Sequence, residues 1–188
     1  QDWIDAFWAK DIQELFRLER RYSFQKFFEL IMAQSGGIFE ANSFASPCEA
    51  SRTTISNYLK VLETTFTAHV IRPFSSKRQN EIISAPKVYG FDTGFVCYHR
   101  GWYELRNEDM GYLWEHFVLN EIFAHRQTRD ISYWRDKQGH EIDFVIHKRG
   151  RPLLAIECKW RDKEFDPANA KVFLRHYDKA QIYVVSHN

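Results

Sequence analysis

Two acidic residues and a lysine near the C-terminus have the types and the spacing that metal-dependent chemistry requires. Asp143 lies in the segment 139–146 (GHEIDFVI), and Glu157 and Lys159 lie in the segment 154–160 (LAIECKW). Both segments are typical of half-buried strands, in which residues i and i+2 share a face, so Glu157 and Lys159 project together. A hairpin through the turn at 147–151 would bring Asp143 beside that pair.

Charges in the middle of an apolar hairpin are costly unless something compensates for them. A divalent cation bound to phosphate would do so. We therefore expect Asp143 and Glu157 to be oxygen ligands of Mg²⁺ or Mn²⁺, with the Cys158 carbonyl as a further ligand. Lys159 would orient or help to deprotonate the attacking water and neutralise charge on phosphate. The alternative is an ordinary strand with solvated charges on its outer face.

The composition bounds the class of protein. The 188 residues suffice for one large domain or two small ones, and 44% of them are hydrophobic, so a dense core is expected. A net charge of +1 neither demands nor excludes nucleic acid as a partner. The cysteines, at positions 48, 97 and 158, form no CxxC pair and are odd in number, which favours a reducing cytoplasm. No apolar run approaches the roughly 20 residues of a membrane span.

The first half of the chain has the pattern of a winged helix-turn-helix domain. We expect a helix at 1–20, a second that contains residues 24–32 and is ended by 35–37, and a third at 51–64, with strands at 67–74, 81–83 and 87–91. Two helices followed by a hairpin with a basic tip give the outline of a winged helix over residues 21–100. Residues 1–20 then read as a helical remnant of a preceding module, and the chain, which begins at Gln1, is expected to be a fragment.

The helix at 51–64 is the candidate recognition helix. Its apolar residues form an inward stripe, and its outward face carries donors and acceptors suited to bases and phosphates. The predicted nucleic-acid-binding residues are Arg52, Thr53, Ser56 and Asn57 on this helix and Lys77 and Arg78 at the tip of the wing. Winged helices also dock on proteins, so a protein partner or an intramolecular contact is the alternative.

The segment 91–94 (FDTG) contains the Asp-Thr-Gly of aspartic proteases. Those enzymes need two such loops sharing one proton, and Phe95 stands where a small residue is usual. We expect instead that Asp92 bonds turn amides and that Gly94 takes a positive φ.

The second half of the chain has a different order of expected helices and strands. After a polar connector at 102–109, Gly111 precedes an expected helix, and then come strands at 131–135, 141–147 and 152–160, a helix within 167–179 and a strand at 181–186. This order predicts an α/β (α+β) domain with a mixed sheet over residues 105–188. Glu115, on its first helix, is a further candidate catalytic acid for a second cation or a water.

The acids and the lysine, in this order and on these elements, resemble the PD-(D/E)xK nuclease superfamily. The motif is Glu115, Asp143 and Glu157-x-Lys159, with Ile142 where many members have proline. The resemblance implies a restriction-endonuclease-like αβββαβ fold and a magnesium-dependent hydrolase of DNA.

The whole chain also resembles the C-terminal half of a prokaryotic family of AAA+-type ATPases, in which a nucleotide-binding module precedes a winged helix and a nuclease-like domain. The similar segments include 54–59, 86–94 and 111–115. No G-x-x-x-x-G-K-[ST] loop is present here, so ATP is expected only in the full-length protein, along with possible self-association through the ATPase module. DNA is the expected partner. The alternative is a non-catalytic DNA- or protein-binding regulatory region with an inactive nuclease fold.

Overall fold

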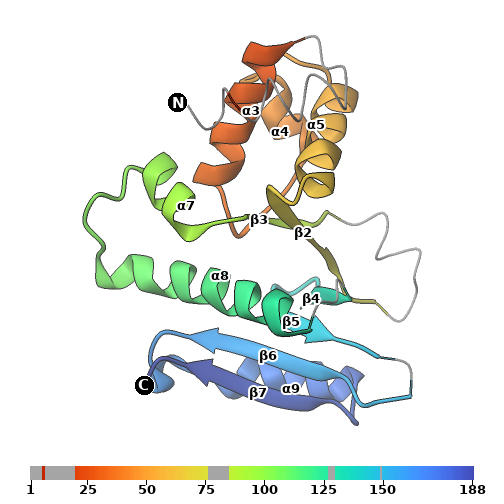
Figure 1. Cartoon of the computed structure of the whole chain (residues 1–188). Helices are drawn as coiled ribbons and strands as arrows, with labels where there is room; N and C mark the ends of the chain where they lie inside the picture. Colours follow the sequence, from red (N-terminus) through yellow and green to blue (C-terminus); the bar gives the residue numbers. More distant parts are fainter. Residues whose placement is uncertain (1–5, 7–19, 76–84, 127–129, 149) are drawn as a thin grey trace. The chain divides into compact units, whose positions relative to one another are not determined.

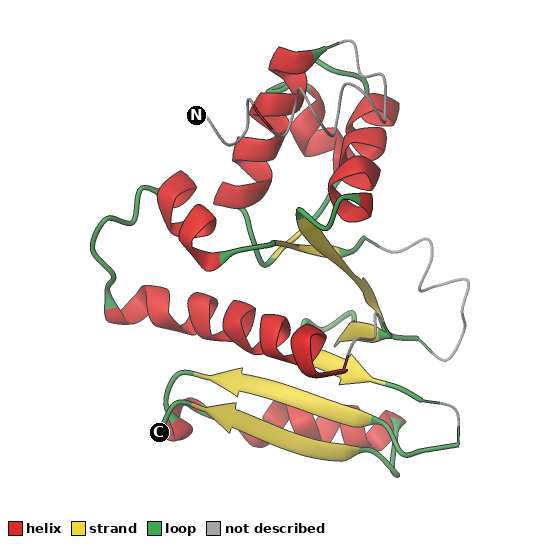
Figure 2. Ribbon diagram, viewed as in Figure 1, coloured by secondary structure: helices red, strands yellow, loops and turns green. Residues whose placement is uncertain are grey.

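The computed structural model describes residues 6, 20–75, 85–126, 130–148 and 150–188. The chain is a mixed α/β protein (Figure 2) that divides into two compact units. The first unit comprises residues 1–70 and 88–103, and the second comprises 71–87 and 104–188. Lys77, Arg78, the strand expected at 81–83 and most of the helix expected at 1–20 lie outside the described residues.

The first unit contains four helices and a small sheet among its described residues. The elements, in chain order, are α3 (Arg21–Ala33), β1 (Gly37–Ile38), α4 (Ala41–Ala45), α5 (Arg52–Thr64), β2 (Ala68–Pro73), β3 (Lys87–Gly90) and α7 (Thr93–Arg100). The strands of this part follow the order β1-β3-β2. The last residues of β2 and the first residue of β3 belong to the second unit.

Aromatic packing fixes α3 against α5. Phe24, Phe27 and Tyr58 are at most 1% exposed, and the Tyr58 ring lies edge-on to Phe24 at a centroid distance of 5.3 Å. The inward stripe expected on α5 is confirmed, because Ile55 and Leu62 are also fully buried. Ser51 caps this helix by accepting a hydrogen bond from the Thr54 amide. The opposite face of α5 is therefore held toward solvent.

Helix α7 was not expected from the sequence. Asp92 is its N-cap and accepts a hydrogen bond from the Phe95 amide at 3.0 Å, so the expectation that Asp92 bonds a local amide is confirmed. The positive φ expected at Gly94 is wrong, because this glycine lies inside the helix. The left-handed residue is Gly101, at φ +69°, which ends the helix.

The second unit is built on a mixed sheet flanked by helices. Its elements are the end of β2, α8 (Asn107–Arg126), β4 (Ile131–Arg135), β5 (Glu141–Ile146), β6 (Leu154–Lys159), the short 3₁₀ helix η2 (Asp162–Glu164), α9 (Pro167–His176) and β7 (Gln181–Ser186). The strand order is β2-β4-β5-β6-β7. The outer pairs, β2 with β4 and β6 with β7, are parallel, whereas β5 is antiparallel to both of its neighbours.

Helix α8 begins four residues before Gly111, where the sequence led us to expect a connector. The Asp109 carboxylate accepts a hydrogen bond from the Arg106 amide at 2.9 Å, and the acids of the first turn, Glu108 and Asp109, suit the positive end of the helix dipole. Among the described residues, no helix has both the length and the apolar character needed to cross a bilayer.

The two long helices of this unit cover opposite faces of the sheet (Figure 1). Phe173 of α9 packs against Val145 and Ala155, which are paired across β5 and β6. Ile156 faces α8, whose Trp114 indole donates a hydrogen bond to the Val185 carbonyl of β7 at 2.9 Å. The parallel and antiparallel pairings place the last residues of β2, β4, β6 and β7 and the first residues of β5 at one end of the sheet.

Removing the cap of α7 tests the structural role of Asp92. We expect Asp92→Ala to lower the free energy of unfolding by about 1 kcal/mol, the usual cost of a lost N-cap, and Asp92→Asn to lower it much less. Urea unfolding followed by far-ultraviolet circular dichroism measures both. Equal losses in the two variants would contradict a capping role.

Candidate active site

The site begins with an irregularity in strand β5. Ser132 and Trp134 of β4 pair with Val145 and Ile142 of β5, so two steps along β4 correspond to three along β5. One extra residue is therefore accommodated between Ile142 and Val145, which is a β-bulge around Asp143. Bulges re-aim side chains and end regular pairing, and they are common beside active sites.

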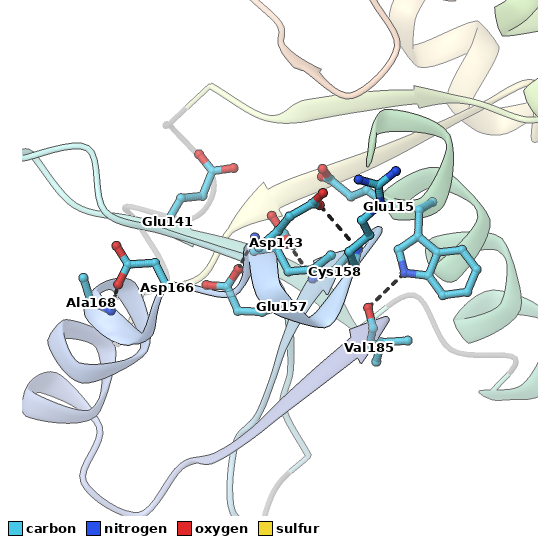
Figure 3. A network of polar contacts seen from close by, with 12 residues as sticks. Glu115, Glu141, Asp143, Glu157, Cys158, Asp166, Ala168 and Val185 are labelled. Carbon is cyan, nitrogen blue, oxygen red and sulfur yellow. Dashed lines mark hydrogen bonds and ion pairs between the residues drawn. The ribbon is translucent and has the colours of Figure 1, made fainter. Parts of the chain in front are cut away.

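Beyond the bulge, β5 and β6 separate. Only Phe144, Val145 and Ile146 of β5 pair with β6, whereas Glu157 and Lys159 continue the ladder with β7 alone. The Asp143 carboxylate occupies the split and accepts a hydrogen bond from the Cys158 amide at 2.8 Å (Figure 3). A side chain thus replaces the strand carbonyl that a regular hairpin would offer to this amide.

Glu157 lies next to Asp143 and is 2% exposed. Its Oε2 accepts a hydrogen bond from Lys159 Nζ at 3.0 Å, but its buried Oε1 receives no hydrogen bond from the described residues. A buried carboxylate oxygen without a donor is unfavourable and calls for an unseen water or ion. Desolvation by burial raises the pKa of Glu157 despite the neighbouring lysine.

Lys159 is half-buried and remains an ammonium ion. Burial lowers its pKa, but the charges of Asp143 and Glu157 outweigh burial, and the pKa is raised above its ordinary value. An ammonium ion donates hydrogen bonds and supplies positive charge, but it cannot accept a proton from water. The contact of Lys159 Nζ with Glu157 Oε2 at 3.0 Å places its positive charge within the acid cluster.

A second lysine, which the sequence analysis missed, belongs to the same cluster. Lys87 has a side chain that is 8% exposed, and it forms ion pairs with Glu115 at 3.2 Å and with Glu141. Burial lowers the pKa of Lys87, but the charges of Glu115 and Glu141 raise it more strongly. The signal for Lys87 was its place in an apolar strand, where an unpaired lysine is rare.

The four carboxylates of the cluster outnumber its two lysines. Figure 3 shows Glu115, Glu141, Asp143 and Glu157 in one network of polar contacts. Burial, followed by the charges of Glu115 and Glu157, raises the pKa of Asp143 well above its ordinary value. If all four acids are ionised, Lys87, Lys159 and the exposed Arg135, which lies 3.8 Å from Glu141, offset three of the four negative charges among the described residues. A divalent cation would offset the remainder.

The donor set fits a hard divalent cation that keeps part of its water shell. Mg²⁺ binds through one or two carboxylates and completes its shell with water and phosphate oxygens. Asp143 and the unpartnered oxygen of Glu157 provide such a pair. A closed protein cage is not present: across the described ranges, no three histidine, cysteine or acidic side chains are grouped as metal ligands.

Four of the predicted nucleic-acid-binding residues lie on α5, in the first unit. Arg52, Thr53, Ser56 and Asn57 are all exposed on the N-terminal half of α5. The Ser56 hydroxyl donates to the Arg52 carbonyl at 3.1 Å, so this side chain is partly engaged within the helix. Lys77 and Arg78 fall outside the described residues.

Comparison with known proteins yields families without a defined function. Residues 1–106 match the model of a domain of unknown function, DUF8612, and residues 110–188 match that of another domain of unknown function, DUF4143. Two mycobacterial proteins, Uncharacterized protein Mb2031c of Mycobacterium bovis and Uncharacterized protein Rv2008c of Mycobacterium tuberculosis, are each 25% identical over 154 residues. The alignments cover 80% of this chain but only 35% of each relative, so the chain spans about a third of their length. No solved structure matches.

Replacing Asp143 by asparagine tests whether the negative charge of the acid cluster opposes folding. The pKa of Asp143 is higher in the folded state than in the unfolded chain. The free energy of unfolding therefore falls as the pH rises from about 4, the unfolded pKa, through the folded pKa, because the folded protein must then carry a buried carboxylate. Asp143→Asn keeps an oxygen for the Cys158 amide and removes the charge. We expect it to raise the free energy of unfolding near pH 8 by at least about 1 kcal/mol, roughly one pKa unit.

Asp136→Asn serves as a control with the opposite sign. Desolvation would raise the pKa of Asp136, but hydrogen bonds from His140 and Gln138 outweigh it and lower this pKa. Its carboxylate therefore stabilises the fold above the unfolded pKa, and the asparagine variant should be less stable near neutral pH. Chemical unfolding in metal-free buffer at several pH values measures both variants. A destabilised Asp143→Asn at every pH would refute the electrostatic account.

Proposed function

The chain belongs to the DUF8612 family. From the geometry of the β5–β6 split, we propose that its second unit is a metal-dependent nuclease domain that hydrolyses phosphodiester bonds. The observation that carries this proposal is the buried Oε1 of Glu157, without a donor, beside the Asp143 carboxylate in the split. The element order helix, three strands, helix, strand supports the restriction-endonuclease-like fold.

In this proposal the acidic residues bind the metal ion and the lysine interacts with the phosphate. Asp143 and Glu157 hold Mg²⁺ or Mn²⁺, which, when bound, polarises a phosphate oxygen and lowers the pKa of a bound water. Lys159, fixed by Glu157, places positive charge where negative charge grows on the phosphate. Glu115 is engaged by Lys87, so it acts on the cluster through that lysine and through its repulsion of Asp143.

We further propose that the first unit is a winged helix that binds DNA. The order α3-β1-α4-α5-β2-β3 and the strand order β1-β3-β2 support this fold, with α5 as the recognition helix. The larger protein would be a AAA+-type ATPase, whose nucleotide module lies outside this chain. This assignment rests on the sequence resemblance and on the length of the mycobacterial relatives.

A second candidate function is a non-catalytic binding region with an idle nuclease fold. The observation that favours it is the pairing within the cluster: Lys87 binds Glu115 and Glu141, and Lys159 binds Glu157. Such pairs stabilise a fold without any catalysis. Experiments on the metal and on cleavage separate the two candidates.

Metal binding and cleavage should depend on the same acids. At a Mn²⁺ concentration of about 100 times Kd, we expect stabilisation of about 2.7 kcal/mol, measured as a rise in Tm. Asp143→Asn and Glu157→Gln should abolish the metal-dependent rise, Lys159→Ala should retain it, and removing the metal with EDTA should reverse it. Glu121→Gln, an exposed acid paired with His125, is the matched control.

Cleavage of plasmid DNA in the same buffers tests the reaction itself. Asp143→Asn and Lys159→Ala should each lower the rate at least about 100-fold, the scale of losing a group that stabilises transition-state charge. Glu121→Gln should cleave normally. A metal-dependent rise in Tm without cleavage, or equal cleavage by all variants, would favour the non-catalytic candidate.

The contribution of α5 to DNA binding is tested separately. If Arg52 contacts a base, we expect Arg52→Ala to weaken binding of a labelled duplex by about 1–3 kcal/mol. If Arg52 contacts a phosphate, we expect the slope of log affinity against log salt concentration to fall by about one. Fluorescence anisotropy in EDTA measures the affinity. Lys171→Ala, on α9, is the control, and identical affinities of the two variants would count against the recognition helix.

A further inference from the structure

A cavity lies in the second unit, beside the ends of β2 and β4. Its volume is about 520 Å³, within the range of small-ligand sites. It is formed by the ends of β2 and β4, the turn after β4 and the end of α9. The lining residues are Pro73, Tyr133, Trp134, Arg135, Asp136, Lys137, Gln138, His176 and Tyr177.

Rigid aromatic residues form part of the cavity wall. Trp134 is 5% exposed and packs edge-on against Phe173 at a centroid distance of 5.2 Å. Tyr133 is held by its hydroxyl, which donates to the Ala85 carbonyl at 2.7 Å. His176 lies beside Trp134, and Tyr177 follows it at the end of α9. The Tyr177 ring packs against Phe173 at a centroid distance of 4.8 Å and is partly exposed, and His176 is exposed, so these two rings are the ones on which a nucleobase could stack.

Positively charged side chains outnumber carboxylates in the cavity wall, where Arg135 and Lys137 face a single acid, Asp136. Asp136 is the only carboxylate among the lining residues, and its oxygens are used by its own turn: they accept from the Gln138 and His140 amides at 2.9 Å and lie 2.7 Å from His140 Nδ1. Arg135 is half-exposed and lies 3.8 Å from Glu141. Lys137, at the turn, is exposed.

The cavity and the acid cluster are neighbours along the sheet. Arg135 pairs with Glu141 across β4 and β5, and Lys87 of the cluster lies 5.7 Å from the Tyr133 ring centroid. Two strand spacings, about 10 Å, separate β4 from β6, which carries Glu157.

We propose that this cavity holds one nucleotide of a nucleic-acid strand, with its phosphate at Lys137 and Arg135 and its base against the rings of His176 and Tyr177. The inference rests on the proposed nuclease function and extends it, because it names the part of the substrate that is gripped beside the acids. Both DNA and RNA contain a phosphate and a base that could be bound in this way, so the test compares a DNA strand with an RNA strand.

Anisotropy of a labelled 12-nucleotide single strand, as DNA and as RNA, tests the cavity in EDTA, where no cleavage occurs. We expect Lys137→Glu to weaken binding by about tenfold and to lower the slope of log affinity against log salt by about one. Lys179→Glu, an exposed lysine between α9 and β7 that does not line the cavity, is the matched control. Equal affinity of the two variants would overturn the proposal.

Photo-crosslinking then locates the strand. A strand substituted with 5-iodouracil should crosslink to His176 or Tyr177, and the crosslink should weaken in Lys137→Glu. Crosslinks confined to α5 would overturn the cavity proposal and leave the nuclease intact. Crosslinks in the cavity of a protein that never cleaves plasmid would support the cavity and refute the nuclease.

Discussion

The second unit depends on how it tolerates four carboxylates in a largely buried cluster. Like charges in a low-dielectric interior repel strongly, and each buried ion also loses its hydration. Lys87 and Lys159 compensate for part of this charge, and the Cys158 amide holds Asp143. The compensation is incomplete, since Glu157 Oε1 has no donor among the described residues. An arrangement that costs folding free energy and is still in place is characteristic of a functional site.

The two halves of the cluster have different characters. Lys87 pairs with Glu115 and Glu141, and Arg135 lies 3.8 Å from Glu141, so this set is close to neutral. Asp143 and Glu157 have raised pKa values and one unpartnered oxygen, so they gain most from a cation. The first set therefore acts as a frame that fixes the electrostatic environment of the second. This division explains how one cluster supports both a structural and a catalytic hypothesis.

The sequence predicted the two strands of the candidate site better than it predicted the elements around them. The i, i+2 rule alone places Glu157 and Lys159 together, and alternation in 141–146 and 154–159 predicts the two strands. Lys87 was missed because it lies 28 residues from Glu115 and is brought there by pairing distant in sequence. Helix α7 was missed because it is only eight residues long and because it begins in a segment with a glycine, which also suits a turn. The bulge at Asp143 could not be predicted, since it depends on the register against β4.

That bulge has a consequence for how this domain varies between relatives. Side chains alternate between the two faces of a strand, so the extra residue between Ile142 and Val145 sets which face each following residue occupies. A homologue that lost one residue there would regain an unbroken hairpin, and its aspartate would no longer enter a gap between strands. Such a protein would retain every letter of the acidic motif without the contact between its aspartate and the β6 amide. The length of this short segment is therefore a sharper criterion than residue identity for deciding which relatives share the arrangement of Asp143 between β5 and β6.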